Sequence, residues 1–227
     1  MGNICPKCGG LGVVVKVDQD GYRYAIECEC LKARKSLQRL ERSGLSKLVE
    51  RYTFDQYKAN YGFQKDLLTK AKNFLNEKDK WFCVLGENGS GKSHICTAIC
   101  GEFLKRGKEI RFMSWITDSV KLKQNINNYE IYEPLIRDYR KCEVLYVDDF
   151  FKGENETKPS SADIKLAMDI LGYRYNNELP TIISSERLVA QLMEIDSATI
   201  GRIVEMSKGY LTEIKGKEKN YRLREYL

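Results

Sequence analysis

One segment limits the folds open to this chain more than any other. Gly86-Glu-Asn-Gly-Ser-Gly-Lys-Ser93 matches the phosphate-binding loop pattern G-x-x-x-x-G-K-S, and it lies between the apolar run Trp81 to Leu85 and a helix-forming stretch. The glycines let the backbone wrap a phosphate, Lys92 can reach the outer phosphates, and the Ser93 hydroxyl can ligate Mg²⁺. The alternative is that this segment is a plain Gly-Ser turn without a ligand. The predicted strand before the glycines and the Lys-Ser pair after them argue against a plain turn. The candidate ligand contacts are Gly86, Glu87, Asn88, Gly89, Ser90, Gly91, Lys92, Ser93 and the following His94, for which a structural role is also open.

A second apolar run, Val144 to Val147, ends in two carboxylates, Asp148 and Asp149. Nucleotide hydrolysis needs one acid to hold a hydrated Mg²⁺ and a second to orient and polarise the attacking water. We predict that Asp148 ligates magnesium together with Ser93 and that Asp149 acts on the water. An ordinary polar strand end is the alternative, and the upstream loop argues against it.

Apolar runs alternate with helical stretches along most of the chain, which is typical of a parallel sheet covered on both faces. The predicted strands are Trp81 to Leu85, Ile110 to Ser114, Val144 to Val147, Thr181 to Ser184 and Tyr210 to Ile214. The fold class is therefore α/β, with five parallel strands.

The amino-terminal segment pairs its cysteines at the open end of a predicted hairpin. Two β-rich runs flank an Asp-Gly turn, and Cys5, Cys8, Cys28 and Cys30 come together at their ends. Four thiolates suit tetrahedral Zn²⁺, which would also supply folding energy to a segment with almost no core. A redox Cys-x-x-Cys is the alternative, but such a pair normally opens a helix, whereas this one opens a glycine turn.

The other four cysteines, Cys83, Cys96, Cys100 and Cys142, fall on predicted core elements, and we expect them to be buried thiols. The apolar runs are far shorter than the roughly 18 residues that span a bilayer, and the amino terminus lacks a secretion signal pattern. We therefore expect a soluble, cytoplasmic protein with no membrane partner.

The net charge of +6 is unevenly spread, because residues 31–51 carry seven basic side chains against two acidic ones. Such a segment favours nucleic acid or an acidic partner, although a solvated helix face explains it equally well. Composition changes near residues 31 and 52 and predicts a zinc-binding module over 1–31, a basic helical linker over 32–51 with a break near Ser43-Gly44, and an ATPase domain over 52–227.

Several motifs together resemble the AAA+ ATPases of the DnaC/DnaI helicase-loader and IstB group. They are Lys92-Ser93-His94, Asp148-Asp149-Phe150, Arg174-Tyr175-Asn176, Pro180 to Glu186 and Asn220-Tyr221-Arg222-Leu223, and the likeness covers roughly residues 45–227. The cysteine module is similar to the zinc-ribbon-like module of some phage and Gram-positive loaders. The resemblance implies an αβα sandwich, with ATP and Mg²⁺ as ligands.

The resemblance also assigns four further residues to roles. Ser185 and Glu186 fall at the polar sensor, where Glu186 replaces the usual Asn. Arg202 matches the arginine finger that reaches the nucleotide of a neighbouring subunit, although Met206 stands where a second Arg is usual. Arg222 fits the second sensor, with Arg224 close enough to be confused with it. A surface salt bridge is the alternative for each arginine.

The function that this resemblance implies is that of a helicase loader with ATPase activity. We expect head-to-tail homo-oligomers that bind single-stranded DNA and a replicative helicase, with Lys121 and Lys123 as candidate DNA contacts. A transposition helper of the IstB kind, or a nucleotide-gated binding module with negligible hydrolysis, remains as an alternative.

Overall fold

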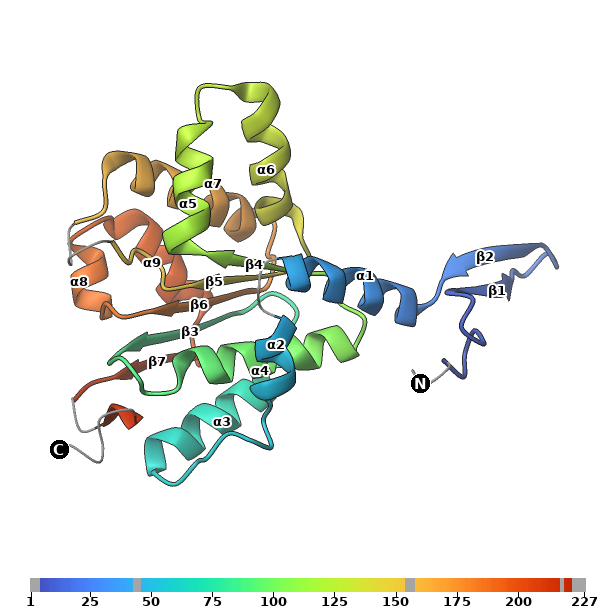
Figure 1. The fold of residues 1–227 in the computed structure, drawn as a ribbon, viewed down its shortest axis with the longest axis horizontal. Helices are drawn as coiled ribbons and strands as arrows, with labels where there is room; N and C mark the ends of the chain where they lie inside the picture. The colour runs from blue at the N-terminus through green and yellow to red at the C-terminus, as the bar shows by residue number, and fades with distance from the viewer. Residues whose placement is uncertain (1–4, 43–45, 154–157, 217–218, 222–227) are drawn as a thin grey trace.

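The computed structural model describes residues 5–42, 46–153, 158–216 and 219–221 (Figure 1). The elements run in this order: β1 (Val13–Val17), β2 (Arg23–Glu27), α1 (Glu29–Arg42), α2 (Ser46–Arg51), α3 (Gly62–Phe74), β3 (Trp81–Gly86), α4 (Lys92–Lys105), β4 (Ile110–Ser114), α5 (Trp115–Gln124), α6 (Tyr129–Lys141), β5 (Val144–Asp148), α7 (Ser161–Asn176), β6 (Thr181–Ser185), α8 (Val189–Met193), α9 (Ser197–Met206) and β7 (Leu211–Ile214). Among the helices of these ranges, none is long and apolar enough to cross a membrane.

Five parallel strands form the central sheet in the order β4-β5-β6-β3-β7, which confirms the predicted α/β fold. Successive side chains of a strand point to opposite faces, so the buried strands supply two cores. Cys83 and Leu85 of β3 pack with α5, α6, α7 and α9 on one face, and Phe82 and Val84 pack with α3 and α4 on the other. The result is the predicted αβα sandwich (Figure 1).

The five predicted strands agree with the observed ones to within one residue at either end. β5 extends to Asp148 and β6 to Ser185, so each of these strands carries a polar side chain at its carboxyl end. The four cysteines expected in the core, Cys83, Cys96, Cys100 and Cys142, are all buried.

The predicted amino-terminal hairpin is also present, with Val13 of β1 opposite Glu27 of β2. It stands away from the sheet and joins it through α1, which lies against β4 (Figure 1). Two helices, α1 and α2, occupy the predicted linker; residues 43–45 between them lie outside the described ranges. The hairpin strands are largely exposed, so they bury little apolar surface of their own.

A buried arginine ties α7 to the carboxyl end of α6. The Arg174 side chain has no exposed surface, and it donates to the carbonyls of Tyr139, Arg140, Cys142 and Pro180 and to Thr181 Oγ1. The last carbonyls of a helix lack partners within it, and the guanidinium supplies donors to them. Arg174 is therefore a structural residue of the sandwich.

Candidate functional site

The phosphate-loop sequence forms a tight turn between β3 and α4. Gly86 has φ +108°, and a Cβ there would lie 2.1 Å from the carbonyl oxygen of Ile214 in β7. Gly91 has φ +95° and begins α4 as its N-cap, so the helix amino terminus faces the loop. Such a turn presents backbone N–H groups and a partial positive charge to an anion.

Lys92 is the first residue of α4, directly after the loop, and it is buried. Its Nζ donates to the carbonyls of Gly86, at 2.7 Å, and Glu87, at 2.9 Å. Burial lowers the pKa of Lys92, and the carboxylates of Glu186, Asp149 and Asp148 act in the opposite direction. The ammonium therefore has weak neutral acceptors that a phosphate could replace.

Asp148, at the end of β5, is oriented by hydroxyl groups from three elements. Tyr146 Oη donates to Asp148 Oδ1 at 2.6 Å, Ser184 Oγ of β6 donates to the same oxygen, and Ser93 Oγ of α4 does so at 3.4 Å. A carboxylate facing a phosphate-loop serine is the donor set that Mg²⁺ takes in phosphate-loop proteins. The residues present thus fit the predicted magnesium pair.

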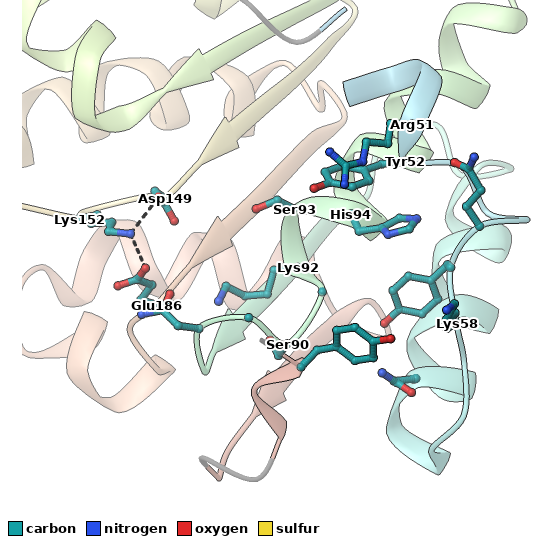
Figure 2. Close-up of a pocket in the computed structure, with 17 residues that line it drawn as sticks. Arg51, Tyr52, Lys58, Ser90, Lys92, Ser93, His94, Asp149, Lys152 and Glu186 are labelled. Carbon is teal, nitrogen blue, oxygen red and sulfur yellow. Dashed lines mark hydrogen bonds and ion pairs between the residues drawn. The ribbon is translucent and has the colours of Figure 1, made fainter. Parts of the chain in front are cut away.

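Asp149 turns away from the strand and enters a small charge network (Figure 2). Lys152 Nζ lies 3.2 Å from Asp149 Oδ2 and also contacts Glu186 Oε1. Burial, and then repulsion by Asp148, raises the pKa of Asp149. The two predicted catalytic acids therefore differ in their surroundings: Asp148 accepts from hydroxyls, whereas Asp149 is paired with a cation.

Lys92, Ser93, Asp149, Lys152 and Glu186 line a cavity of about 530 Å³ at the carboxyl ends of the strands, whereas Asp148 is not among its lining residues. Figure 2 shows Lys92 and Ser93 between the Asp149–Lys152–Glu186 network and a wall that contains Tyr52 and His94. The Tyr52 and His94 rings stack at 4.7 Å, and the histidine contacts the Thr53 carbonyl at 2.9 Å. Loop residues that line the cavity are Asn88, Gly89, Ser90, Gly91, Lys92 and Ser93.

Tyr57 forms another part of this wall. Its ring lies 3.2 Å from the position of a Cβ on Gly91, and its buried hydroxyl has no hydrogen-bond partner within the described part of the chain. A buried hydroxyl without a partner is costly, so a ligand group in the cavity is its natural acceptor or donor.

The remaining predicted site residues lie in different places. Ser185 is buried and donates to the Phe150 carbonyl at 2.7 Å, whereas Glu186 lines the cavity. Arg202 lies over the Tyr175 ring at 5.6 Å and is not among the residues that line the cavity of its own chain. Arg222 and Arg224 fall outside the described residues.

The two lysines predicted to contact DNA differ in their pairing. Lys123 is bonded to Asp163 at 2.5 Å, while the largely exposed Lys121 lies 4.0 Å from Asp118. Lys121 is thus the more accessible of the two.

The four amino-terminal cysteines do come together. Their sulfurs all lie within 4.8 Å of one another, with Cys5 Sγ 3.8 Å from Cys28 Sγ and Cys8 Sγ 3.4 Å from Cys30 Sγ. A tetrahedral zinc with Zn–S bonds of about 2.3 Å places its sulfurs about 3.8 Å apart. The Gly12 N–H donates to Cys8 Sγ and, together with the contact to Cys30, lowers the pKa of Cys8 to about 6, whereas the same contact raises the pKa of Cys30 to about 12. The cluster therefore fits Zn²⁺.

Sequence reasoning missed several residues of the cavity. Lys152, Tyr52 and Tyr57 belong to no motif, and only the fold brings them to the phosphate loop. Ser184 could be found from the sequence, because a hydroxyl at the carboxyl end of one predicted strand beside a strand that ends in acids is a usable signal.

A parallel sheet with a phosphate loop, a serine–aspartate pair and a second acid at its carboxyl edge defines a P-loop nucleotide-binding protein. The family model "IstB-like ATP binding protein" matches residues 26–225. The chain therefore belongs to this ATP-binding AAA+ family.

Two relatives and one solved structure illustrate the likeness. YqaM of Bacillus subtilis, described as uncharacterized, is 28% identical over 85% of this chain and 64% of its own length. The replicative helicase loader DnaC of Escherichia coli is 29% identical over 52% of this chain, which thus spans half of DnaC. A crystal structure of the DnaC helicase loader superimposes with a TM-score of 0.62 at 22% identity, covering 74% of this chain and 98% of that one, and shows the same fold.

Proposed function

We propose that this protein hydrolyses ATP and acts as a loader of a replicative helicase. The observation that carries the first part is that the ends of β3 and β5 bring the phosphate loop, the Ser93–Asp148 pair and Asp149 together, with the loop, Ser93 and Asp149 lining one cavity. The second part is supported by the DnaC relatives, which are named as replicative helicase loaders.

The chain's own groups suit each step of hydrolysis. Loop N–H groups and Lys92, released from the Gly86 and Glu87 carbonyls, would hold the phosphates. Ser93 and Asp148 would hold Mg²⁺, which neutralises charge that develops on the phosphoryl oxygens. Asp149 would accept a hydrogen bond from the attacking water and orient it, because it is the acid that does not face Ser93.

The opposite wall suits the nucleoside. Tyr52 and His94 offer stacked ring faces, and burial lowers the pKa of His94, which keeps the imidazole neutral at physiological pH. The Tyr57 hydroxyl would bond to the nucleotide.

We further propose that Cys5, Cys8, Cys28 and Cys30 hold one Zn²⁺, and that the zinc module contacts the helicase. Head-to-tail assembly would carry Arg202 to the cavity of the next subunit, and single-stranded DNA would bind along the assembled subunits. The cation–π contact of Arg202 with Tyr175 leaves its guanidinium on the surface of α9, where a neighbour can approach.

Helicase loading onto circular single-stranded DNA tests this function. The protein is mixed with the replicative helicase of its own organism and ATP, and the DNA-bound helicase is measured. We expect loading with the wild type and none with Lys92→Ala, because that variant loses the main cation for the outer phosphates. Wild-type protein that hydrolyses ATP but leaves the DNA-bound helicase unchanged would contradict the loader function alone.

A further inference from the structure

Lys152 lines the cavity, and the mechanism above does not use it. Lys152 Nζ bonds to Asp149 Oδ2 at 3.2 Å and to Glu186 Oε1, and the side chain is 35% exposed (Figure 2). Burial alone would lower the pKa of Lys152, but the contacts with Glu186 and Asp149 outweigh it and raise the pKa. The group is therefore an ammonium at physiological pH.

The loop that carries Lys152 adopts an unfavourable backbone. Asp149 has φ 54° and Phe151 has φ 58°, in the left-handed region that side chains rarely occupy. Backbone strain of this kind gathers at functional sites.

Buried contacts hold this loop in place. The Phe150 and Phe151 rings stack at 4.1 Å and both pack on Trp115. The Phe150 N–H donates to the Ser184 carbonyl at 2.8 Å, and the Lys152 N–H donates to the Asp149 carbonyl at 2.9 Å. The backbone of Lys152 is therefore fixed at the rim of the cavity, and its flexible stem leaves the ammonium as the part that can move.

The charges around the cavity indicate which ligand group the Lys152 ammonium could bind. Asp149 and Glu186 line the cavity beside Lys92 and Lys152, whereas Arg51 and Lys58 lie on the opposite wall (Figure 2). A triphosphate carries more negative charge than a diphosphate. The extra charge is on the terminal phosphate, which would lie beside Asp149, the group proposed to orient the attacking water. An ammonium already bonded to Asp149 lies on that side of the cavity.

We propose that Lys152 distinguishes ATP from ADP: the terminal phosphate takes the ammonium from Glu186, whereas ADP leaves the Lys152–Glu186 contact intact. This inference rests on the proposed ATP site and adds the residue that reads which nucleotide is bound. Glu186, at the sensor position, then acts as the acceptor that competes with the phosphate.

Binding of two nucleotides in the presence of Mg²⁺ tests the proposal without relying on turnover. Dissociation constants for a non-hydrolysable ATP analogue and for ADP are measured by calorimetry on the full chain. Lys152→Met should weaken the ATP analogue about tenfold or more, the effect of one charge-assisted hydrogen bond, while the ADP affinity changes less than about twofold. Lys152→Arg, which keeps the charge, should recover part of the difference.

Two further variants sharpen the test. Glu186→Gln should shift the ratio the other way, towards the ATP analogue, because it releases the ammonium, and it should have no such effect in a Lys152→Met background. Lys105→Met is the matched control, because Lys105 also pairs with a glutamate, Glu102 at 2.6 Å, but at the far end of α4. It should leave both constants unchanged.

Equal losses for both nucleotides in Lys152→Met, or no loss for either, would overturn the inference while the ATP site stands. Wild-type protein that binds neither nucleotide would overturn the proposed ATP site and the inference with it.

Discussion

Single residues of the cavity are paired within the protein before any nucleotide arrives. Lys92 bonds to neutral loop carbonyls, so a phosphate can bind it without breaking an ion pair. Asp149, in contrast, already forms an ion pair with Lys152. The hydroxyls on Asp148 fix its orientation without neutralising its charge. The site is therefore arranged for a cation at Asp148 and for a reacting group at Asp149.

Asp149→Asn should bind ATP with near wild-type affinity and hydrolyse it about 10²–10⁴-fold more slowly, because the amide is a far weaker acceptor for the water. Steady-state turnover and nucleotide binding check this. Asp138→Asn is the control, since Asp138 of α6 pairs with Arg111 of β4 at 3.8 Å and does not line the cavity. Wild-type turnover in Asp149→Asn would assign the water to another group.

Arg174→Met should lower the free energy of unfolding by at least about 3 kcal/mol, because it leaves several buried carbonyls unsatisfied at about 1–3 kcal/mol each. Arg174→Lys should lose a similar amount, since one ammonium cannot replace the guanidinium fork. Urea titration measures both. A loss under 1 kcal/mol would show that the carbonyls find other donors.

The elements of the sandwich could be predicted from the sequence because their apolar runs are fully buried and bounded by clear motifs. Asp148 and Ser93 could be placed together because parallel strands bring their carboxyl ends to one edge. The places of Lys152 and Tyr57 in the site could not be predicted. Lys152 depends on the backbone conformation of its loop, and Tyr57 depends on how its segment packs on the phosphate loop, and no sequence periodicity encodes either. The predicted boundaries of the module, linker and ATPase domain stay predictions.

The β1–β2 hairpin depends on its cysteines, since Val15 and Val17 are well exposed and Cys28 is 2% exposed. Metal analysis should find one zinc per chain, and Cys28→Ser should lose it while ATP binding persists, because zinc binding supplies the folding energy of such a module. Cys100→Ser, at a buried cysteine of α4, should keep the zinc. Full zinc in Cys28→Ser would refute the ligand set, and a metal-free parent would favour the redox alternative.

Arg202 does not line the cavity of its own chain, so its proposed role as an arginine finger requires a second subunit. Arg202→Ala should bind ATP yet lose hydrolysis. An equal mixture with Asp149→Asn should regain up to about a quarter of wild-type turnover, because a quarter of random head-to-tail contacts join two intact halves. Arg137→Ala, at an exposed position of α6, is the control. Oligomers that form in the mixture without any turnover would show that Arg202 does not act in trans.

The two edge strands of the sheet, β4 and β7, are shielded by different means. At β7, Lys70 of α3 donates to the Leu211 carbonyl at 3.0 Å, and at β4 the helix α1 lies against the strand. The unpaired backbone groups of an edge strand can pair with another chain, and lysines or covering helices suppress this pairing. Removing residues 1–42 to obtain an isolated ATPase domain would therefore expose the edge of β4. Such a fragment should aggregate even though it retains every residue that lines the nucleotide cavity.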